Sequence, residues 1–148
     1  MGELEFDSSN VTVVFDARIG SRRDEVDGIV EGLMQVIRAL PCAREHLDEV
    51  HLALSEALAN AVIHGNRDDP TKQVHIRAGC ANGEQLLLAI TDQGPGFDFS
   101  AIPDPTTAEN IFSTHGRGIF LMNRLMDQAE YRLGGRQVVL RKRVSGRM

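Results

Sequence analysis

The sequence contains no hydrophobic run close to the roughly 20 residues that a membrane-spanning helix requires. It also has no excess of basic residues: 16 Lys and Arg stand against 21 Asp and Glu, which leaves a net charge of −5. A broad nucleic-acid-binding surface is therefore not expected. The first residues, MGELEFD, lack the basic and apolar regions of a signal peptide. We expect a cytoplasmic protein that binds neither nucleic acid nor membrane.

Cysteine is scarce as well. Cys42 and Cys80 lie in apolar surroundings without the spacing of a metal site, so we expect two reduced structural thiols. The five histidines form no zinc pattern, because His46 and His51 are five residues apart and would lie on different faces of a helix.

Length and composition indicate one domain that spans residues 1–148, with a core over about residues 11–143. A chain of 148 residues is long enough to bury about two-thirds of its unfolded surface. Apolar residues make up 42% and charged residues 25% of the chain, as in ordinary soluble globular proteins.

The first half of the chain predicts one strand and two helices. Residues 11–15 are rich in β-branched residues and predict a strand. Residues 22–40 have apolar side chains at helical spacing, and Pro41 ends that helix. A second helix is predicted over about residues 43–64, with Gly65 as its C-terminal cap.

The second half predicts mainly strands. Two strands, about residues 73–81 and 85–91, are joined by Asn82-Gly83, which is a strong hairpin signal. Residues 97–115 have no clear period and predict a long loop, and loops of this length are usually functional. The remaining predictions are a short helix over residues 118–126 and a hairpin formed by residues 131–133 and 137–143.

This order of elements indicates an α+β fold. We expect a two-layer α/β sandwich, in which helices cover one face of a mostly antiparallel, mixed sheet.

Residues 55–65, SEALANAVIHG, set Glu56, Asn60 and His64 at steps of four on the second predicted helix. Residues four apart lie on the same helical face. Apolar residues flank them on both sides, and a polar group between apolar faces costs free energy unless a partner compensates it. The pattern indicates a site. Hydrogen bonds to nearby backbone would also explain it, and His64 would also interact favourably with the helix C-terminus.

Asp92 follows an apolar predicted strand and precedes Gly94 and Gly96. An aspartate at a strand end can direct its carboxylate into a cleft, and glycine lets a ligand approach the backbone closely. Taken alone, such a sequence is more often an ordinary turn.

Gly116, Arg117 and Gly118 stand at the predicted start of the short helix. Glycines there expose backbone N–H groups, the helix dipole favours an anion, and an arginine can bind phosphate oxygens with two hydrogen bonds. A flexible hinge with a solvated arginine is the alternative. In combination, the three segments indicate a nucleotide pocket with a lid.

In order and spacing, Glu56-x-x-x-Asn60-x-x-x-His64, Asp92-x-Gly94-x-Gly96 and Gly116-Arg117-Gly118 resemble the N, G1 and G2 boxes of the GHKL ATPase superfamily. Within it, the chain is more similar to the small anti-sigma-factor serine/threonine kinases, in its length and in segments between residues 97 and 131. The resemblance covers about residues 11–143.

The resemblance implies an enzyme that uses ATP and Mg²⁺ to phosphorylate a serine or threonine of an anti-sigma-antagonist protein. It also implies sequestration of a sigma factor and a homodimer. At the base end of the site, Asp92 would accept a hydrogen bond from the adenine amine. Gly94 belongs to the same turn, Gly96 would make room for the base, and His64 would shape the end of the site.

At the phosphate end, the resemblance implies that Asn60 coordinates Mg²⁺ and that Glu56 is the general base toward the attacking hydroxyl. Arg117 would hold the γ-phosphate, and Gly116 and Gly118 would present backbone N–H groups to the phosphates.

Two departures from the family pattern motivate a second hypothesis. His115 stands where many relatives have glycine, which would stiffen the lid or bring an imidazole near the phosphates, and Arg136-Gln137 replaces small hydroxyl residues. The protein would then be an ATP-gated binding module without phosphoryl transfer. A histidine-kinase catalytic domain is a third, weaker hypothesis, because the first predicted helix holds no histidine to accept a phosphoryl group.

Overall fold

The computed structural model describes residues 11–40, 42, 45–82, 84–96 and 122–143. Five strands form one sheet in the order β1-β2-β3-β5-β4, and all four pairings are antiparallel. The strands are β1 (Val11–Gly20), β2 (Gln73–Ala81), β3 (Gln85–Thr91), β4 (Gln128–Arg132) and β5 (Gln137–Arg143). The expected α+β fold is confirmed, and the described part of the sheet is antiparallel throughout rather than mixed.

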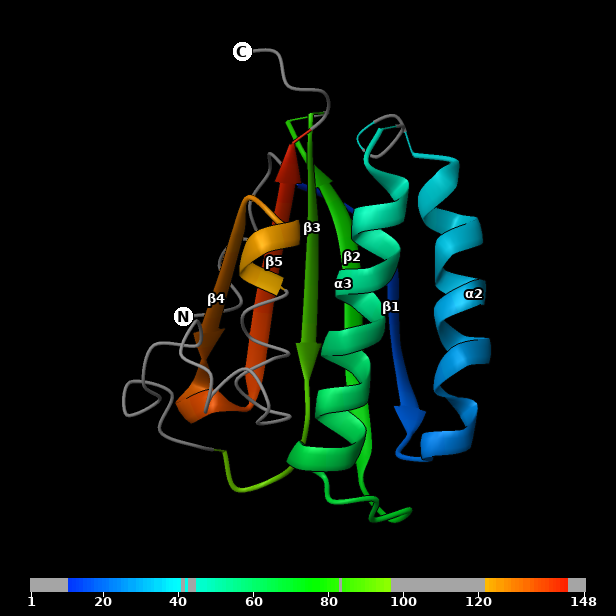
Figure 1. The fold of residues 1–148 in the computed structure, drawn as a ribbon, viewed down its shortest axis with the longest axis vertical. Helices are drawn as coiled ribbons and strands as arrows, with labels where there is room; N and C mark the ends of the chain where they lie inside the picture. Colours follow the sequence, from blue (N-terminus) through cyan, green and yellow to red (C-terminus); the bar gives the residue numbers. More distant parts are fainter. Residues whose placement is uncertain (1–10, 41, 43–44, 83, 97–121, 144–148) are drawn as a thin grey trace.

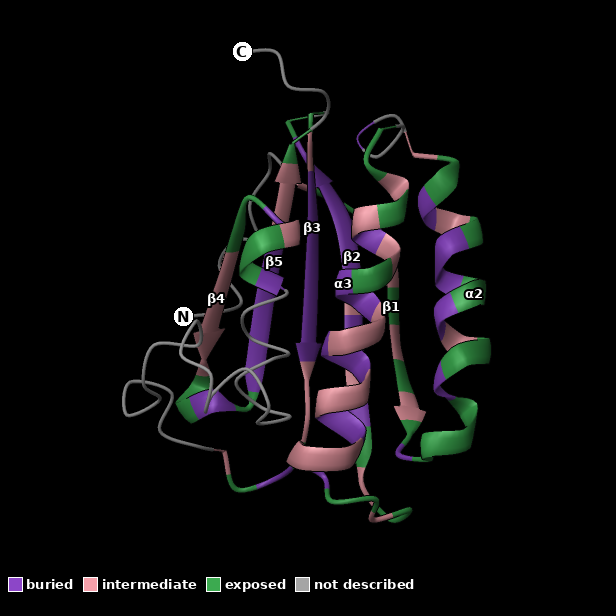
Figure 2. Cartoon of the chain, in the orientation of Figure 1, coloured by how far each residue is buried: buried purple, intermediate pink, exposed green. Residues whose placement is uncertain are grey.

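Two helices, α2 (Val26–Arg38) and α3 (Leu47–Ala59), lie side by side on one face of this sheet (Figure 1). Each buries a stripe of apolar residues at helical spacing and exposes its opposite side (Figure 2). The stripe of α2 consists of Val26, Val30, Leu33, Met34 and Ile37. With α3 and the inner residues of β2, β3 and β5 it forms the main hydrophobic core.

The first strand is longer than predicted. All of Val11–Gly20 pairs with β2, with a bulge between Val13 and Phe15. Its second half alternates polar and apolar residues, as in Asp16-Ala17-Arg18-Ile19, which is the period-2 pattern of a half-buried strand. The predicted strand ended at Phe15, where the run of β-branched and apolar residues ends and the charged residue Asp16 follows.

The helices also differ at their ends. A short 3₁₀ helix, η1 (Arg23–Glu25), precedes α2, and α3 begins at Leu47 rather than near residue 43. His46, just before α3, has a φ of 65°, so its backbone is left-handed and the helix does not extend through it. None of the helices in the described segments is long and apolar enough to cross a membrane.

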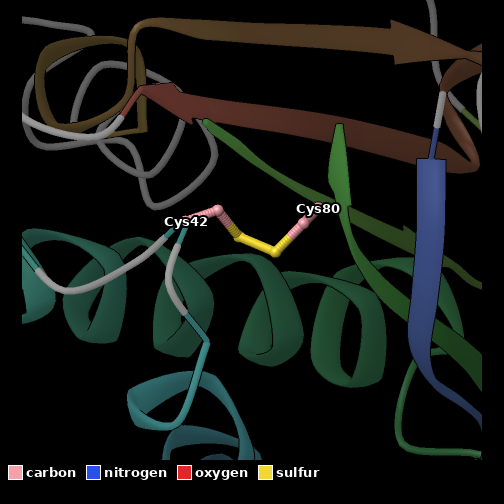
Figure 3. The surroundings of a disulfide bond; sticks show 2 residues. All are labelled: Cys42 and Cys80. Carbon is pink, nitrogen blue, oxygen red and sulfur yellow. A yellow bond between two sulfur atoms is a disulfide. The ribbon is translucent and has the colours of Figure 1, made fainter. Parts of the chain in front are cut away.

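The expectation of two reduced thiols is wrong for this structure. Cys42, between the two helices, and Cys80, in β2, form a disulfide with Cα atoms 5.9 Å apart (Figure 3). Both residues are buried. Their separation of 38 positions gave no sign of the pairing, because only the packing of the helices on the sheet brings them together.

Replacement of both cysteines by serine should lower the free energy of unfolding by up to about 4 kcal/mol. The disulfide restricts the unfolded chain, and the closure of a loop of this length has about that value in the chain-entropy model. Denaturant unfolding with and without a thiol reductant measures the effect. The serine variant should be insensitive to the reductant, and an equally insensitive wild type would contradict the prediction.

Candidate functional site

The second predicted helix changes its helical type at Asn60, one of the predicted site residues. After Ala59, residues Asn60–Gly65 form a π-helix, η3, in place of the continuous α-helix that the sequence predicts. The wider turn is closed by a hydrogen bond of 2.8 Å from Asn66 N to Ala61 O, five residues earlier. Short π-helical segments occur frequently at functional sites, because they change the direction of the side chains that follow.

A cavity of about 390 Å³ lies between η3, the end of β3 and the β4–β5 hairpin. Its volume is within the range of small-molecule sites. Apolar and polar groups contribute similar areas to its wall. The apolar side chains include Ala57, Ile63, Ile90, Met122 and Val138, and the polar ones include Asn60, His64, Asp92 and Arg136.

Glycine is required where η3 meets the turn after β3. Gly65 was predicted as the C-terminal cap of the helix, but it is the last residue of η3 and its φ is not positive. A Cβ atom on Gly65 would instead collide with the Asp92 carboxylate, and one on Gly94 would collide with the Gly65 carbonyl oxygen. Close approach of two backbone segments, rather than a cap, is therefore the reason for glycine here.

Gly96 completes this turn and lines the cavity. Its φ is 80°, and a Cβ atom there would collide with the carbonyl oxygen of Gly134 in the short helix η5 (Leu133–Gly135). Only glycine combines a left-handed backbone with so close a neighbour. The turn that carries Asp92 is thus held between η3 on one side and η5 on the other.

Asn66 is a positioning residue that the sequence reasoning missed. Its side chain is almost fully buried, at 1% exposure. Its Oδ1 accepts a hydrogen bond of 2.8 Å from Gln93 N, and its Nδ2 donates one of 3.0 Å to Gln73 O. One amide therefore ties the end of η3 to β2 and to the Asp92 turn. A polar residue directly after a helix with site residues was the available signal.

Asp92 holds a half-buried carboxylate in the cavity wall. Burial raises its pKa above the usual value, and this outweighs the opposing effects of the Gly94 N–H and of the charges on Arg136 and Lys72. Gly94 N donates a hydrogen bond of 2.8 Å to Asp92 Oδ1. The Asp92 N–H donates to Arg136 O, so the backbone is fixed as well. A hydrogen-bond acceptor among apolar side chains fits a flat base that carries an amino group.

Asn60 lines the same cavity, and its Nδ2 is buried without a hydrogen-bond partner in the described part of the chain. A buried amide group of this kind is costly unless a ligand completes it. Rotation of the amide by 180° places Oδ1 at the same position, and an amide oxygen suits Mg²⁺. The described residues contain no cluster of three acidic, histidine or cysteine side chains, so phosphate oxygens would have to supply further ligands.

Glu56 lies one helical turn before Asn60 and is half-buried, but it is not among the residues that line the cavity. His64 does line it, together with Asn60 and Asp92. With Gly96, the structure therefore brings four of the predicted site residues together, while Glu56 and Gly94 are not among the residues that line the cavity. His115, Gly116, Arg117 and Gly118 lie outside the described residues.

Arg136 and Gln137, the two departures from the family pattern in the closing hairpin, lie in different surroundings. Arg136 lines the cavity, and its Nε donates a hydrogen bond of 3.0 Å to Leu133 O. Gln137 is buried, and its Nε2 donates to Thr91 Oγ1 at 2.9 Å, across β5 and β3. Tyr131 also lines the cavity, and burial raises the pKa of its hydroxyl, which stays protonated.

Comparison with known sequences assigns the class of protein that this fold and cavity suggest. Residues 19–142 match the histidine kinase-like ATPase domain. The chain therefore belongs to this family, the GHKL superfamily of ATPases.

Within the family, the chain is similar to serine-protein kinases and anti-sigma factors. It is 31% identical over 90 residues to serine-protein kinase RsbW of Bacillus subtilis, which is 57% of this chain and 56% of that protein. It is 30% identical over 106 residues to the anti-sigma F factor of Clostridium beijerinckii, which is 67% and 72% of the two chains. RsbW of Bacillus pumilus is 28% identical over 130 residues, or 82% and 80%. The match to the Bacillus subtilis protein thus spans little more than half of its length.

Substitution Asn66→Ala should lower the free energy of unfolding by about 2–3 kcal/mol, because two buried hydrogen bonds lose their partner. ATP affinity should fall about tenfold, since the Asp92 turn is no longer held against η3. Chemical denaturation and calorimetric titration measure the two effects. Gln35→Ala, on the exposed side of α2, is the control. An Asn66→Ala protein with wild-type stability and affinity would show that the amide has no positioning role.

Substitution Asp92→Asn should weaken ATP binding without lowering the free energy of unfolding at pH 7. It keeps an oxygen for the Gly94 N–H but removes a carboxylate whose pKa is raised by burial. In the wild type, ionisation of this group above its raised pKa destabilises the folded state, and protonation at lower pH removes that cost. The variant should therefore be at least as stable as wild type at pH 7, with the difference shrinking as the pH falls through the raised pKa.

ATP affinity of Asp92→Asn should fall about 10- to 100-fold at pH 7, the size expected for loss of a hydrogen bond to a charged group. Unfolding curves between pH 4 and 8 and titrations with Mg·ATP test both statements. A variant that binds ATP like wild type would remove Asp92 from the base-recognition site.

Proposed function

We propose that this protein is an ATP-dependent serine/threonine kinase of an anti-sigma pathway. It phosphorylates a small antagonist protein and binds a sigma factor. The observation that carries the proposal is the half-buried Asp92 carboxylate in the wall of a cavity that Asn60 also lines. Membership in the histidine kinase-like ATPase family supports ATP as the ligand, and the names of the relatives, serine-protein kinase and anti-sigma F factor, support the pathway.

The adenine base fits the end of the cavity at Asp92. Its exocyclic amine donates to the carboxylate, and the apolar residues Ile90, Met122 and Val138 contact its faces. Gly96 leaves room for the base, because no side chain projects from the turn at this position. Arg136 and Lys72 add positive charge near Asp92, which favours its ionised form.

The phosphates extend toward Asn60, whose amide oxygen would hold Mg²⁺. A metal held there would neutralise charge on the phosphate oxygens. Glu56 accepts the proton of the substrate hydroxyl as the oxygen attacks the γ-phosphorus, and ADP leaves with the electron pair of the broken bond. Its place beside the cavity, one turn before Asn60, suits a group that meets a second protein at the end of the phosphate chain. Arg117 holds the γ-phosphate in this scheme.

The position of Glu56 also supports a second candidate function. A carboxylate that does not line the cavity is compatible with a protein in which ATP controls the affinity for a partner and no phosphoryl transfer occurs. Asp92 and Asn60 keep the same roles in both proposals, so ATP binding alone does not distinguish them.

Substitution Glu56→Gln should reduce phosphorylation of an antagonist protein by about 100-fold or more, which is the usual contribution of a general base. ATP affinity should stay within about twofold of wild type, because Glu56 does not line the cavity. Incubation with γ-labelled ATP measures the first quantity, and titration calorimetry measures the second.

Glu84→Gln, an exposed carboxylate in the turn between β2 and β3, is the matched control and should label the antagonist at the wild-type rate. Equal labelling by wild type and Glu56→Gln would exclude Glu56 as the base. A tight, ATP-dependent complex with the antagonist and no labelling by either protein would favour the binding module over the kinase.

A further inference from the structure

Arg136, a departure from the family pattern, lies opposite Asp92 where β3 ends and β5 begins. Ile90 and Val138 are paired on these two strands and line the cavity, and the pair that follows them points to the opposite face of the sheet. Asp92 and Arg136 continue the alternation, and Asp92 N donates a hydrogen bond of 2.9 Å to Arg136 O. Both side chains therefore return to the cavity side, and both line the cavity.

The side chain of Arg136 is anchored along its length. Its Nε donates a hydrogen bond of 3.0 Å to Leu133 O, which also accepts one of 3.3 Å from Arg136 N. Its Cγ lies 3.4 Å from the position that a Cβ atom on Gly96 would occupy, so the stem of the side chain runs beside the Gly96 turn. These contacts hold the guanidinium where its charge acts on the Asp92 carboxylate.

The residue that anchors Arg136 has a strained backbone. Leu133 has a φ of 55°, and its side chain is 45% exposed. A left-handed backbone is costly for a leucine, and such strained residues occur mainly at functional sites. In this hairpin the unusual conformation brings Leu133 O to the Nε of Arg136. The strain is thus linked to the orientation of a side chain that lines the cavity.

Arg136 and Asp92 lie side by side, yet their side chains do not bond to each other. Asp92 Oδ1 accepts its hydrogen bond from Gly94 N, and Arg136 uses only Nε. Within the residues that the structure describes, the two terminal nitrogens of Arg136 have no partner. A guanidinium has five N–H donors, so most of them remain available. The cavity wall therefore presents an acceptor and a donor next to one another.

Adenine carries the complementary groups in the same arrangement. Its amine is a donor, and the ring nitrogens on either side of the amine, N1 and N7, are acceptors. A carboxylate and a guanidinium side by side can hold the amine and one of these nitrogens together, which fixes the orientation of the base. The small hydroxyl residue of the family pattern has a shorter, uncharged side chain. Arg136 thus adds a charged donor at this position.

We propose that Arg136 is a specificity-determining residue of the ATP site and donates a hydrogen bond to N1 or N7 of adenine while Asp92 accepts one from the amine. This role rests on the proposed function, because it takes ATP as the ligand. The hydrogen bond is charge-assisted, so its loss should lower ATP affinity about tenfold or more.

Titration calorimetry with the Mg²⁺ complexes of ATP, 1-deaza-ATP and 7-deaza-ATP tests the contact. Each analogue has a C–H group in place of one ring nitrogen, and wild type should bind one of them about tenfold or more weakly than ATP. Arg136→Ala should bind ATP about tenfold or more weakly than wild type does, and should bind that same analogue as well as it binds ATP. Equal affinity of wild type for all three nucleotides would overturn the inference, as would discrimination that persists in Arg136→Ala.

Arg136→Lys separates the hydrogen bond from the charge. A lysine keeps the positive charge near Asp92, but a single ammonium group cannot bond to Leu133 O with the geometry of Nε and also reach the base with a second donor. The variant should therefore lose both ATP affinity and the discrimination against the analogue. Wild-type ATP affinity in Arg136→Lys, without this discrimination, would show that Arg136 acts only through its charge on Asp92, and would overturn the inference.

Purine riboside triphosphate, which lacks the amine, distinguishes failure of this inference from failure of the proposed function. Wild type should bind it more weakly than ATP, because Asp92 loses its donor. If wild type binds none of these nucleotides, the proposed function fails and the role of Arg136 fails with it. If wild type prefers ATP to purine riboside triphosphate but binds both deaza analogues as tightly as ATP, only the role of Arg136 is overturned.

The matched control is Arg38→Ala, which removes an exposed arginine from the last turn of α2. Arg38 does not line the cavity. This variant should bind all four nucleotides with wild-type affinity. A loss of discrimination in Arg38→Ala equal to that in Arg136→Ala would show that the effect belongs to the net charge of the protein, and would overturn the inference.

Discussion

The close contact between the end of the second helix and the end of β3 is the constraint on which the cavity depends. Gly65 leaves space for the Asp92 carboxylate, and Gly94 leaves space for the Gly65 carbonyl. Asn66 then joins both segments to the start of β2 through two hydrogen bonds. Because Gly65 lies directly against the Asp92 carboxylate and Gly94 directly against the Gly65 carbonyl, a methyl group at either glycine would separate the two segments.

This contact also holds the Asp92 carboxylate at a position where burial disfavours its charged form. Asp92 has a raised pKa, and its surroundings compensate the buried carboxylate only in part. Under the proposed function, a base with an amino group needs such an acceptor, and Asp92 would then lower stability in order to bind it. The π-helix at Asn60–Gly65 is a second local irregularity of the same kind, again directly at the cavity.

Much of the fold was predictable because local patterns and tertiary packing agree. β2 and β3 have the predicted bounds, and Asn82 has the left-handed φ of 56° that the hairpin signal requires. The errors have separate physical causes. The π-helix depends on contacts of Asn66 with distant strands, and the left-handed backbone of His46 has no pattern in a single sequence. The Cys42–Cys80 pair depends on how the helices lie on the sheet.

The sequence by itself determined the α+β class and the periods of the helices and strands, because these follow from side-chain chemistry and from spacing along the chain. Its resemblance to the GHKL superfamily indicated the residues of an ATP site. The tertiary structure decided which residues share a cavity: Asn60, His64 and Asp92 line it, and Glu56 lies beside it. It also decided that five arginines of an acidic chain lie on the face of the sheet opposite the helices, because only the pairing of strands brings Arg18, Arg77, Arg132, Arg141 and Arg143 to one side.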